Sequence, residues 1–148
     1  MEEKDKPQFA IHRIYIKDVS FESPSTPQVF IGPWSPKVNL QVGSKATSLG
    51  EHNYEVVLSV TATANQDDKT AFLVEVHQAG IFMIQGYEPQ QLDIMLGSYC
   101  PNILFPFARE VVADLVTKGG FPPLLLAPIN FDALYAQRLK QKAQETQA

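Results

Sequence analysis

The fold class is decided by the stretch Gly97-Ser98-Tyr99-Cys100-Pro101-Asn102-Ile103-Leu104-Phe105-Pro106-Phe107-Ala108-Arg109-Glu110. It combines two prolines with several large apolar side chains. Pro101 suits the first positions of a helix, where its missing N–H costs nothing. Pro106 follows five residues later, so the regular helix either begins near Phe105 or is kinked there. The stretch predicts the beginning of an unusually apolar helix.

The composition is that of one folded domain of 148 residues. A hydrophobic content of 45% with 19% charged residues excludes a disordered chain. The net charge of −4 and the absence of a Lys/Arg cluster argue against a nucleic-acid partner. Cys100 is the single cysteine, so no intrachain disulfide can form, which is typical of a reducing cytoplasm.

The sequence shows neither a signal peptide nor a membrane-spanning run. The charged segment 1–6 lacks the apolar core of a signal peptide. No apolar run approaches the ~20 residues that span a membrane. We therefore expect a soluble, cytoplasmic domain over residues 1–148, with flexible segments at about 1–8 and about 141–148.

Four segments alternate polar and apolar residues with period two, at 9–22, 37–42, 54–64 and 70–84, and predict β-strands. The turn 65–68 joins the last two as a hairpin. Together they predict an antiparallel sheet with one solvated face. In the first segment, strict alternation puts a mixed set on one face, Phe9, Ile11, Arg13, Tyr15, Lys17, Val19 and Phe21. Neither face of that strand is then purely apolar.

Two helices are predicted after the strands. The first runs from about Phe105 to Lys118, has an apolar face wider than an ordinary amphipathic stripe, and ends at Gly119-Gly120. The second begins near Asn130, a favourable N-cap residue. Strands followed by helices indicate the α+β class.

Two connecting segments, 23–37 and 119–130, are rich in both proline and large apolar side chains. Connecting segments are usually polar and lie on the surface. These two either pack as irregular core or line an apolar groove, and the residues alone leave both readings open. An apolar patch of this size on a small domain usually binds something.

The sequence contains no recognisable active site. His12, His52 and His77 are scattered without metal-ligand spacing, and no phosphate-binding glycine loop is present. Cys100 lies in an apolar setting, which indicates a buried structural cysteine rather than a nucleophile. We therefore expect neither an enzyme nor a bound metal or cofactor.

A set of acidic and apolar residues shares the exposed side of the predicted sheet. Asp18 and Glu22 lie on one face of their strand, about 13 Å apart by the strand rise. Leu73 and Glu75 lie opposite the apolar face of theirs. The set is either an ordinary solvated face or a docking surface for a basic partner.

The stretch 97–110 resembles the signature of the SecB family of protein-export chaperones. The resemblance extends from about Phe9 to Tyr135. It includes the segments 13–15, 17–22, 54–58, 70–73, 80–82 and 126–134. It implies a four-stranded antiparallel sheet with two C-terminal helices packed on one face.

The resemblance also implies assembly and function. The family forms a homotetramer, a dimer of dimers with the long helices between the sheets. The residues expected to serve that packing are Val74, Val76, Gln78, Val111 and Leu115. Without using ATP, the family binds unfolded precursors of exported proteins, keeps them translocation-competent and delivers them to the SecA motor ATPase. The expected SecA-docking residues are Asp18, Glu22, Leu73 and Glu75.

The client-binding groove is assigned here from composition and loop position. Its expected residues are Phe30, Trp34, Phe121, Leu124 and Tyr135. An alternative function is a SecB-like chaperone dedicated to one partner, such as an antitoxin. The chain departs from the family in its short C-terminal segment, 138–148, which has no acidic run and so does not predict a tail contact with SecA.

Overall fold

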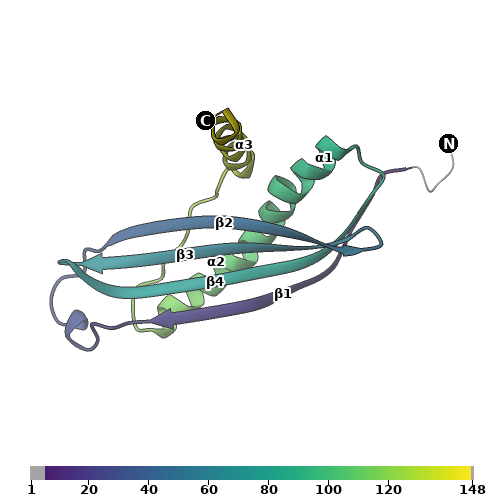
Figure 1. Cartoon of the computed structure of the whole chain (residues 1–148). Coiled ribbons are helices and arrows are strands. Elements are labelled where there is room, and N and C mark those ends of the chain that lie inside the picture. The colour runs from purple at the N-terminus through teal and green to yellow at the C-terminus, as the bar shows by residue number, and fades with distance from the viewer. Residues whose placement is uncertain (1–5, 148) are drawn as a thin grey trace.

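The predicted strands form one antiparallel sheet in the order β1-β4-β3-β2 (Figure 1). The computed structural model describes residues 6–147, and side chains through residue 145. The strands are β1 (Gln8–Glu22), β2 (Lys37–Gly50), β3 (Asn53–Gln66) and β4 (Lys69–Gln85). The sheet followed by helices confirms the α+β class. β2 continues past its predicted end at Val42, because pairing with β3 extends a small, polar segment that has little strand pattern of its own.

Both hairpin turns use residues with positive φ. At the predicted turn between β3 and β4, Asp67 and Asp68 have φ of 50° and 63°. Two successive positive φ values are the mark of a tight hairpin turn, and aspartate tolerates them. The turn from β2 to β3 is built in the same way at Glu51 and His52.

Strict alternation along β1 was a wrong prediction, because two irregularities interrupt it. The register with β4 shifts between Ile11 and Arg13, and again between Ile16 and Asp18. Each extra residue moves the following side chains to the other face. The result is an apolar face toward the helices and a polar face away from them. The apolar face carries Phe9, Ile11, Ile14, Ile16, Val19 and Phe21.

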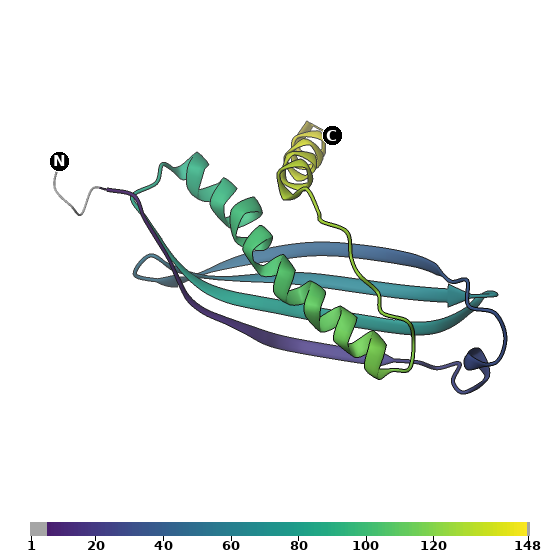
Figure 2. The same ribbon diagram turned by 180° about the vertical axis from the view of Figure 1, so that it is seen from behind.

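One continuous helical path crosses the sheet diagonally on one side (Figure 2). It consists of α1 (Pro89–Ile94), a π-helical turn η3 (Met95–Tyr99) and α2 (Cys100–Lys118). The prediction of a helix beginning near Phe105 was therefore wrong. Pro106 lies inside α2. It and Asn102, whose carbonyl loses its helical partner, are both on the exposed side of the helix, so no unpaired group is left in the core.

The core lies between α2 and the two central strands. α2 contributes Leu104, Ala108, Val112 and Val116, which are fully buried against β3 and β4. Cys100 is buried beside them, as expected. Burial raises the pKa of its thiol to about 12, so the thiol stays protonated.

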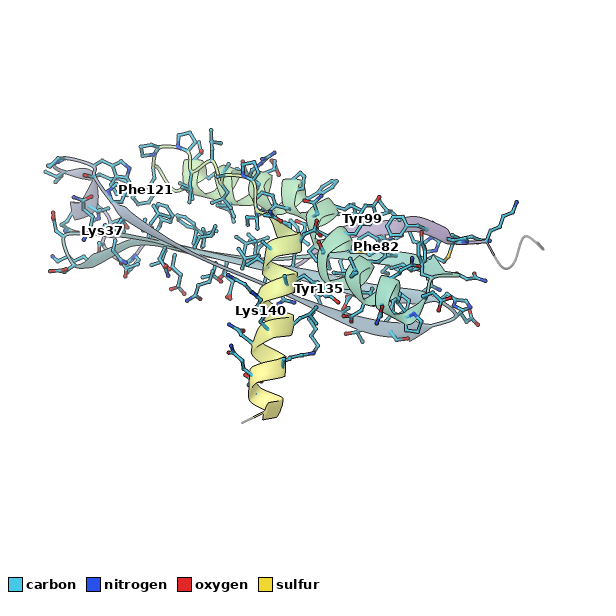
Figure 3. All side chains as sticks on the ribbon, turned by 90° about the horizontal axis from the view of Figure 1, so that it is seen from above. Lys37, Phe82, Tyr99, Phe121, Tyr135 and Lys140 are labelled. Atoms are coloured by element: carbon cyan, nitrogen blue, oxygen red, sulfur yellow. The ribbon has the colours of Figure 1, made fainter. Side chains whose placement is uncertain are left out.

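The last helix, α3 (Phe131–Gln147), does not lie on the sheet face. It packs against η3 and crosses beyond the β2 edge of the sheet (Figures 1 and 3). The prediction that two helices pack on one face of the sheet is therefore confirmed for α2 and wrong for α3. The predicted N-cap is confirmed, since the Asn130 Oδ1 atom accepts a hydrogen bond from the Ala133 N–H at 3.0 Å. The helix continues to Gln147, through the segment expected to be a flexible tail. The expected flexible segment at about 1–8 falls largely outside the described residues.

Candidate functional site

The four acidic and apolar residues predicted for docking share the face of the sheet that the helices leave uncovered. Glu22 lies directly opposite Leu73 in the β1–β4 pairing, and Ser20 lies opposite Glu75. Asp18 lies opposite His77 on the same face. Side chains directly opposite each other in an antiparallel pair project to the same side. We call this set, Asp18, Glu22, Leu73 and Glu75, the acidic surface.

Neighbouring side chains hold part of the acidic surface in place. The Ser59 hydroxyl and the Nδ1 atom of His77 form a hydrogen bond of 2.7 Å. The Thr61 hydroxyl donates to Glu75 Oε1 at 3.4 Å, and the Nε2 atom of His77 lies 3.7 Å from the same oxygen. Asp18 and Glu22 are exposed and have no hydrogen-bond or ion-pair partner within residues 6–145. Their carboxylates are therefore available to a basic partner.

Three residues predicted for the client groove meet in one aromatic cluster. The ring of Phe121 lies 5.1 Å from that of Phe30 and 5.2 Å from that of Trp34, measured between centroids. Phe72, from the helix-facing side of β4, lies beneath them at 5.1 Å from Phe121. We call Phe30, Trp34, Phe72 and Phe121 the aromatic cluster. It ties the β1–β2 connection, which contains the short 3-10 helix η2 (Gln28–Phe30), to the segment after α2.

The two readings of these loops are each correct for different residues. Phe121 is buried and closes the core, whereas Phe30 is 49% exposed. Leu124 is partly buried and packs against the core. The same β1–β2 connection also lines a cavity of about 550 Å³ between residues 24–33 and the β3–β4 turn. The loops therefore supply both core and accessible apolar surface.

Tyr135 does not join the aromatic cluster. It lies on α3 beside Gly97, and its hydroxyl donates a hydrogen bond to the carboxylate of Asp93. Figure 3 shows Phe121 near one end of the sheet and Tyr135 near the middle. Sequence reasoning grouped the two residues from composition and loop position, whereas Tyr135 lies in a helix.

The residues predicted for assembly divide into buried and accessible sets. Val74 and Val76 are fully buried within the chain, so a second copy cannot touch them directly. Gln78 and Val111 line an open groove of about 310 Å³ between β1 and α2. Ile16 and Phe107, 49% and 47% exposed, lie in the same groove. Leu115 is partly buried on α2.

Sequence comparison identifies the family. The family model for the preprotein translocase subunit SecB matches residues 2–142. A protein-export protein SecB from Nitrosococcus oceani is 63% identical over 143 residues, which are 95% of this chain and 87% of that protein. The chain belongs to the SecB family. A second protein-export protein SecB, from Methylococcus capsulatus, is 58% identical over 148 residues, 99% of this chain and 96% of its own length.

The fold agrees with that of a solved SecB-like chaperone. The structure from Mycobacterium tuberculosis was determined with a peptide from an antitoxin and superimposes with a TM-score of 0.61. The match covers 82% of this chain and 87% of that one at 17% sequence identity. SecB is a chaperone of protein export, and the motif at 97–110 identified this family correctly.

The described part of the chain offers neither a metal-binding cluster nor a membrane-spanning helix. Within it, no three His, Cys, Asp or Glu side chains are placed to hold a metal ion. None of its helices is long and apolar enough to cross a membrane.

Two features of the candidate surfaces escaped the sequence analysis. Phe72 is the floor of the aromatic cluster, and its place in an alternating apolar strand gave no sign of that role. A second aromatic group, Phe9, Phe82 and Tyr99, lies at the other end of the helix-facing side (Figure 3). Its members are far apart in sequence, so only the sheet register and the helix crossing bring them together.

Proposed function

We propose that this chain is an ATP-independent holdase of the cytoplasm. It binds unfolded precursors of exported proteins, keeps them translocation-competent and delivers them to SecA. Membership of the SecB family and the large accessible apolar area around the aromatic cluster support this proposal.

The client-binding surface is the aromatic cluster together with the loops that flank it. Ile31 is 83% exposed and Leu125 is 77% exposed, and they lie in the two loops that meet at Phe121. Exposed apolar side chains attract the apolar segments that an unfolded chain presents. Each such contact contributes little by itself, so several must act together for a tight but reversible grip.

The SecA-docking site is the acidic surface. It lies on the face of the sheet opposite to α2, so a partner docked there leaves the helix side free. Attraction between opposite charges at an exposed surface accelerates encounter and gives specificity. The accessible carboxylates of Asp18 and Glu22 fit a basic docking segment.

Assembly as a tetramer, a dimer of dimers, is supported by the β1 edge and the outer side of α2. β1 is an edge strand, and an uncovered edge with apolar side chains invites pairing. Ile11, Ile16 and Val19 remain exposed on its helix-facing side, beside the exposed Phe107 of α2. The Oε1 atom of Gln78 is buried without a hydrogen-bond partner in the described part of the chain. A second copy would cover the exposed apolar groups and bury the groove that Gln78 lines further from water.

Client capture is tested by refolding kinetics. A small client protein is diluted from denaturant with and without the chaperone, and its recovery of native fluorescence is followed. We expect the chaperone to slow refolding and not to bind the native client. Ile31→Ser with Leu125→Ser should weaken the delay several-fold, whereas Leu49→Ser, at an exposed position on β2, should leave it unchanged. Equal binding of native and unfolded client would reject the proposal.

The second candidate function is that of a chaperone dedicated to one antitoxin. It is suggested by the antitoxin peptide in the structure of the mycobacterial chaperone. A dedicated chaperone needs no SecA-docking face, so the acidic surface favours export. The test is loss of SecA binding when Asp18 and Glu75 are both replaced by alanine.

A further inference from the structure

The uncovered face of the sheet carries a second charged region, of opposite sign to the acidic surface. Arg13 lies opposite Ile81, which lies opposite Glu55 on its other side. Lys45, on β2, lies opposite Val57 on the same face. Lys17 extends from the second irregularity of β1 to Glu55. We call Arg13, Lys17 and Lys45 the basic region.

The carboxylate of Glu55 in this region is already neutralised. Glu55 accepts hydrogen bonds from Lys17 at 2.8 Å and from the Tyr15 hydroxyl. These bonds, that from Lys17 first, lower the pKa of Glu55 and keep it ionised. Arg13 is exposed and has no ion-pair partner among the described residues. Among the described residues, this end of the sheet carries the carboxylate of Glu55 and that of Glu51 in the adjoining β2–β3 turn, so three cations outnumber two anions and the region is net positive.

The two charged regions are aligned along the strands. On β4, Glu75 belongs to the acidic surface and Ile81 lies opposite Arg13 of the basic region. These two β4 residues are six positions apart, about 20 Å at the strand rise. Between them on β4 lie His77, which is opposite Asp18, and Ala79; Ser59 and Val57 are their partners on β3. An extended polypeptide of about six residues spans the same distance. A continuous basic segment would be attracted at one end and repelled at the other.

We propose that this face binds an extended segment of a partner protein that carries cations at one end and carboxylates about six residues away. The basic region is then a second contact of the same docking site, and it fixes the position of the segment along the strands. This inference rests on the proposed docking function of the acidic surface. Nucleic acid does not fit, because Asp18, Glu22 and Glu75 would repel its phosphates.

Two synthetic peptides test the proposal. One has Lys-Arg-Lys, five alternating Gly and Ser residues, and Glu-Glu; the other ends in Gln-Gln instead. Affinities are measured by calorimetry at low ionic strength. The glutamate peptide should bind the unmodified chaperone about three- to tenfold more tightly, as expected for two exposed ion pairs. The preference should vanish with Arg13→Gln plus Lys45→Gln, while the affinity for the glutamine peptide stays the same.

A matched control removes the same charge from the helix layer. Lys118→Gln with Lys140→Gln should retain the preference for the glutamate peptide. Equal affinities of the two peptides for the unmodified chaperone, failure of both to bind it, or loss of the preference in the control would overturn the inference. The double variant Asp18→Ala with Glu75→Ala distinguishes a failure of the proposed docking function from a failure of this further inference. If it leaves both affinities unchanged, the proposed docking surface itself is wrong.

Discussion

The backbone of Gly97 lies against the ring of Tyr135, with no room between them for a side chain. A Cβ atom added at position 97 would come within 2.6 Å of Tyr135 Cδ1. The same contact region includes the bond from Tyr135 to Asp93, and the Ser98 hydroxyl donates to Asp132 Oδ1 at 2.5 Å. Both Gly97 and Ser98 belong to η3. The contacts of this π-helical turn therefore fix the position of α3.

Gly97→Ala should displace α3. The added methyl group forces the Tyr135 ring away, and overpacking of this kind costs about 1–3 kcal/mol. We expect faster hydrogen exchange and faster proteolysis in α3, with the sheet unaffected. The measurement is exchange by mass spectrometry on the purified variant.

Two control variants make the Gly97 prediction specific. Gly97→Ala combined with Tyr135→Ala should restore exchange to the level of Tyr135→Ala alone, because the clash is gone. Gly43→Ala should change little in α3, because an added Cβ there meets nothing within 4 Å. The explanation would be wrong if Gly97→Ala left exchange in α3 as it is in the unmodified chain.

Ile16→Asp should weaken assembly. Ile16 is 49% exposed on the single chain and lies in the groove beside Gln78 and Phe107, so a charge there costs little in folding. If a second copy covers the groove, the carboxylate is buried unpaired, which is strongly unfavourable. Light scattering should show a tetramer for the unmodified chain and smaller species for the variant. Leu49→Asp should remain tetrameric, and an unmodified chain that is monomeric would contradict the proposed assembly.

Glu55→Gln should reduce stability more at neutral pH than in acid. Hydrogen bonds from Lys17 and Tyr15 lower the pKa of Glu55 in the folded chain. A carboxylate whose pKa is lower in the folded than in the unfolded chain stabilises the fold at pH values above its unfolded pKa, about 4.3. That stabilisation is lost as the pH falls through the folded pKa. The variant should therefore be about 1 kcal/mol less stable at pH 7, and this difference in stability should shrink as the pH falls below the unfolded pKa.

Urea unfolding at pH 7 and at pH 3, at one protein concentration, measures the Glu55 effect. Asp114→Asn serves as the control, because its pair with Lys118 on α2 is exposed and should contribute little at either pH. If Glu55→Gln lowered the free energy of unfolding by the same amount at pH 7 and at pH 3, the ionised carboxylate could not be the cause.

The sequence predicted what depends on local patterns. Alternation identified the four strands, and the aspartates at 67–68 identified a hairpin. Asn130 marked the beginning of α3. The SecB motif at 97–110 identified the family. Each of these signals lies within a few residues of the feature that it predicts.

The irregularities of β1 could not be predicted from alternation. An extra residue shows in the sequence only as a break in phase, and the break between Ile16 and Asp18 looks like an ordinary polar strand. The two shifts cancel, so Asp18 and Glu22 lie on the face opposite Phe9, where alternation had put them, and only the residues between the shifts, such as Ile14 and Ile16, are on the face that alternation did not predict. The alternation assigned to β1 was thus wrong for residues 13–16, and the docking role of Asp18 and Glu22 stays a prediction.

The candidate surfaces were predicted in part for the same reason. Phe30, Trp34 and Phe121 converge because two connecting loops end beside Phe72, which is a matter of tertiary packing. The position of Tyr135 depends on η3, and no local signal identified a π-helical turn ahead of Pro101. Long-range packing of this kind overrides what a single segment indicates.

The central claim is that one molecule holds an unfolded client on its loops and SecA on its acidic surface at the same time. Size-exclusion chromatography with light scattering, on a mixture of chaperone, SecA and an unfolded client, tests it directly. We predict a complex of all three. Asp18→Ala with Glu75→Ala should lose only SecA, whereas the matched charge control Asp114→Ala with Glu145→Ala should lose neither. Client that displaces SecA, or an acidic-surface variant that loses both partners while still folded, would contradict the account.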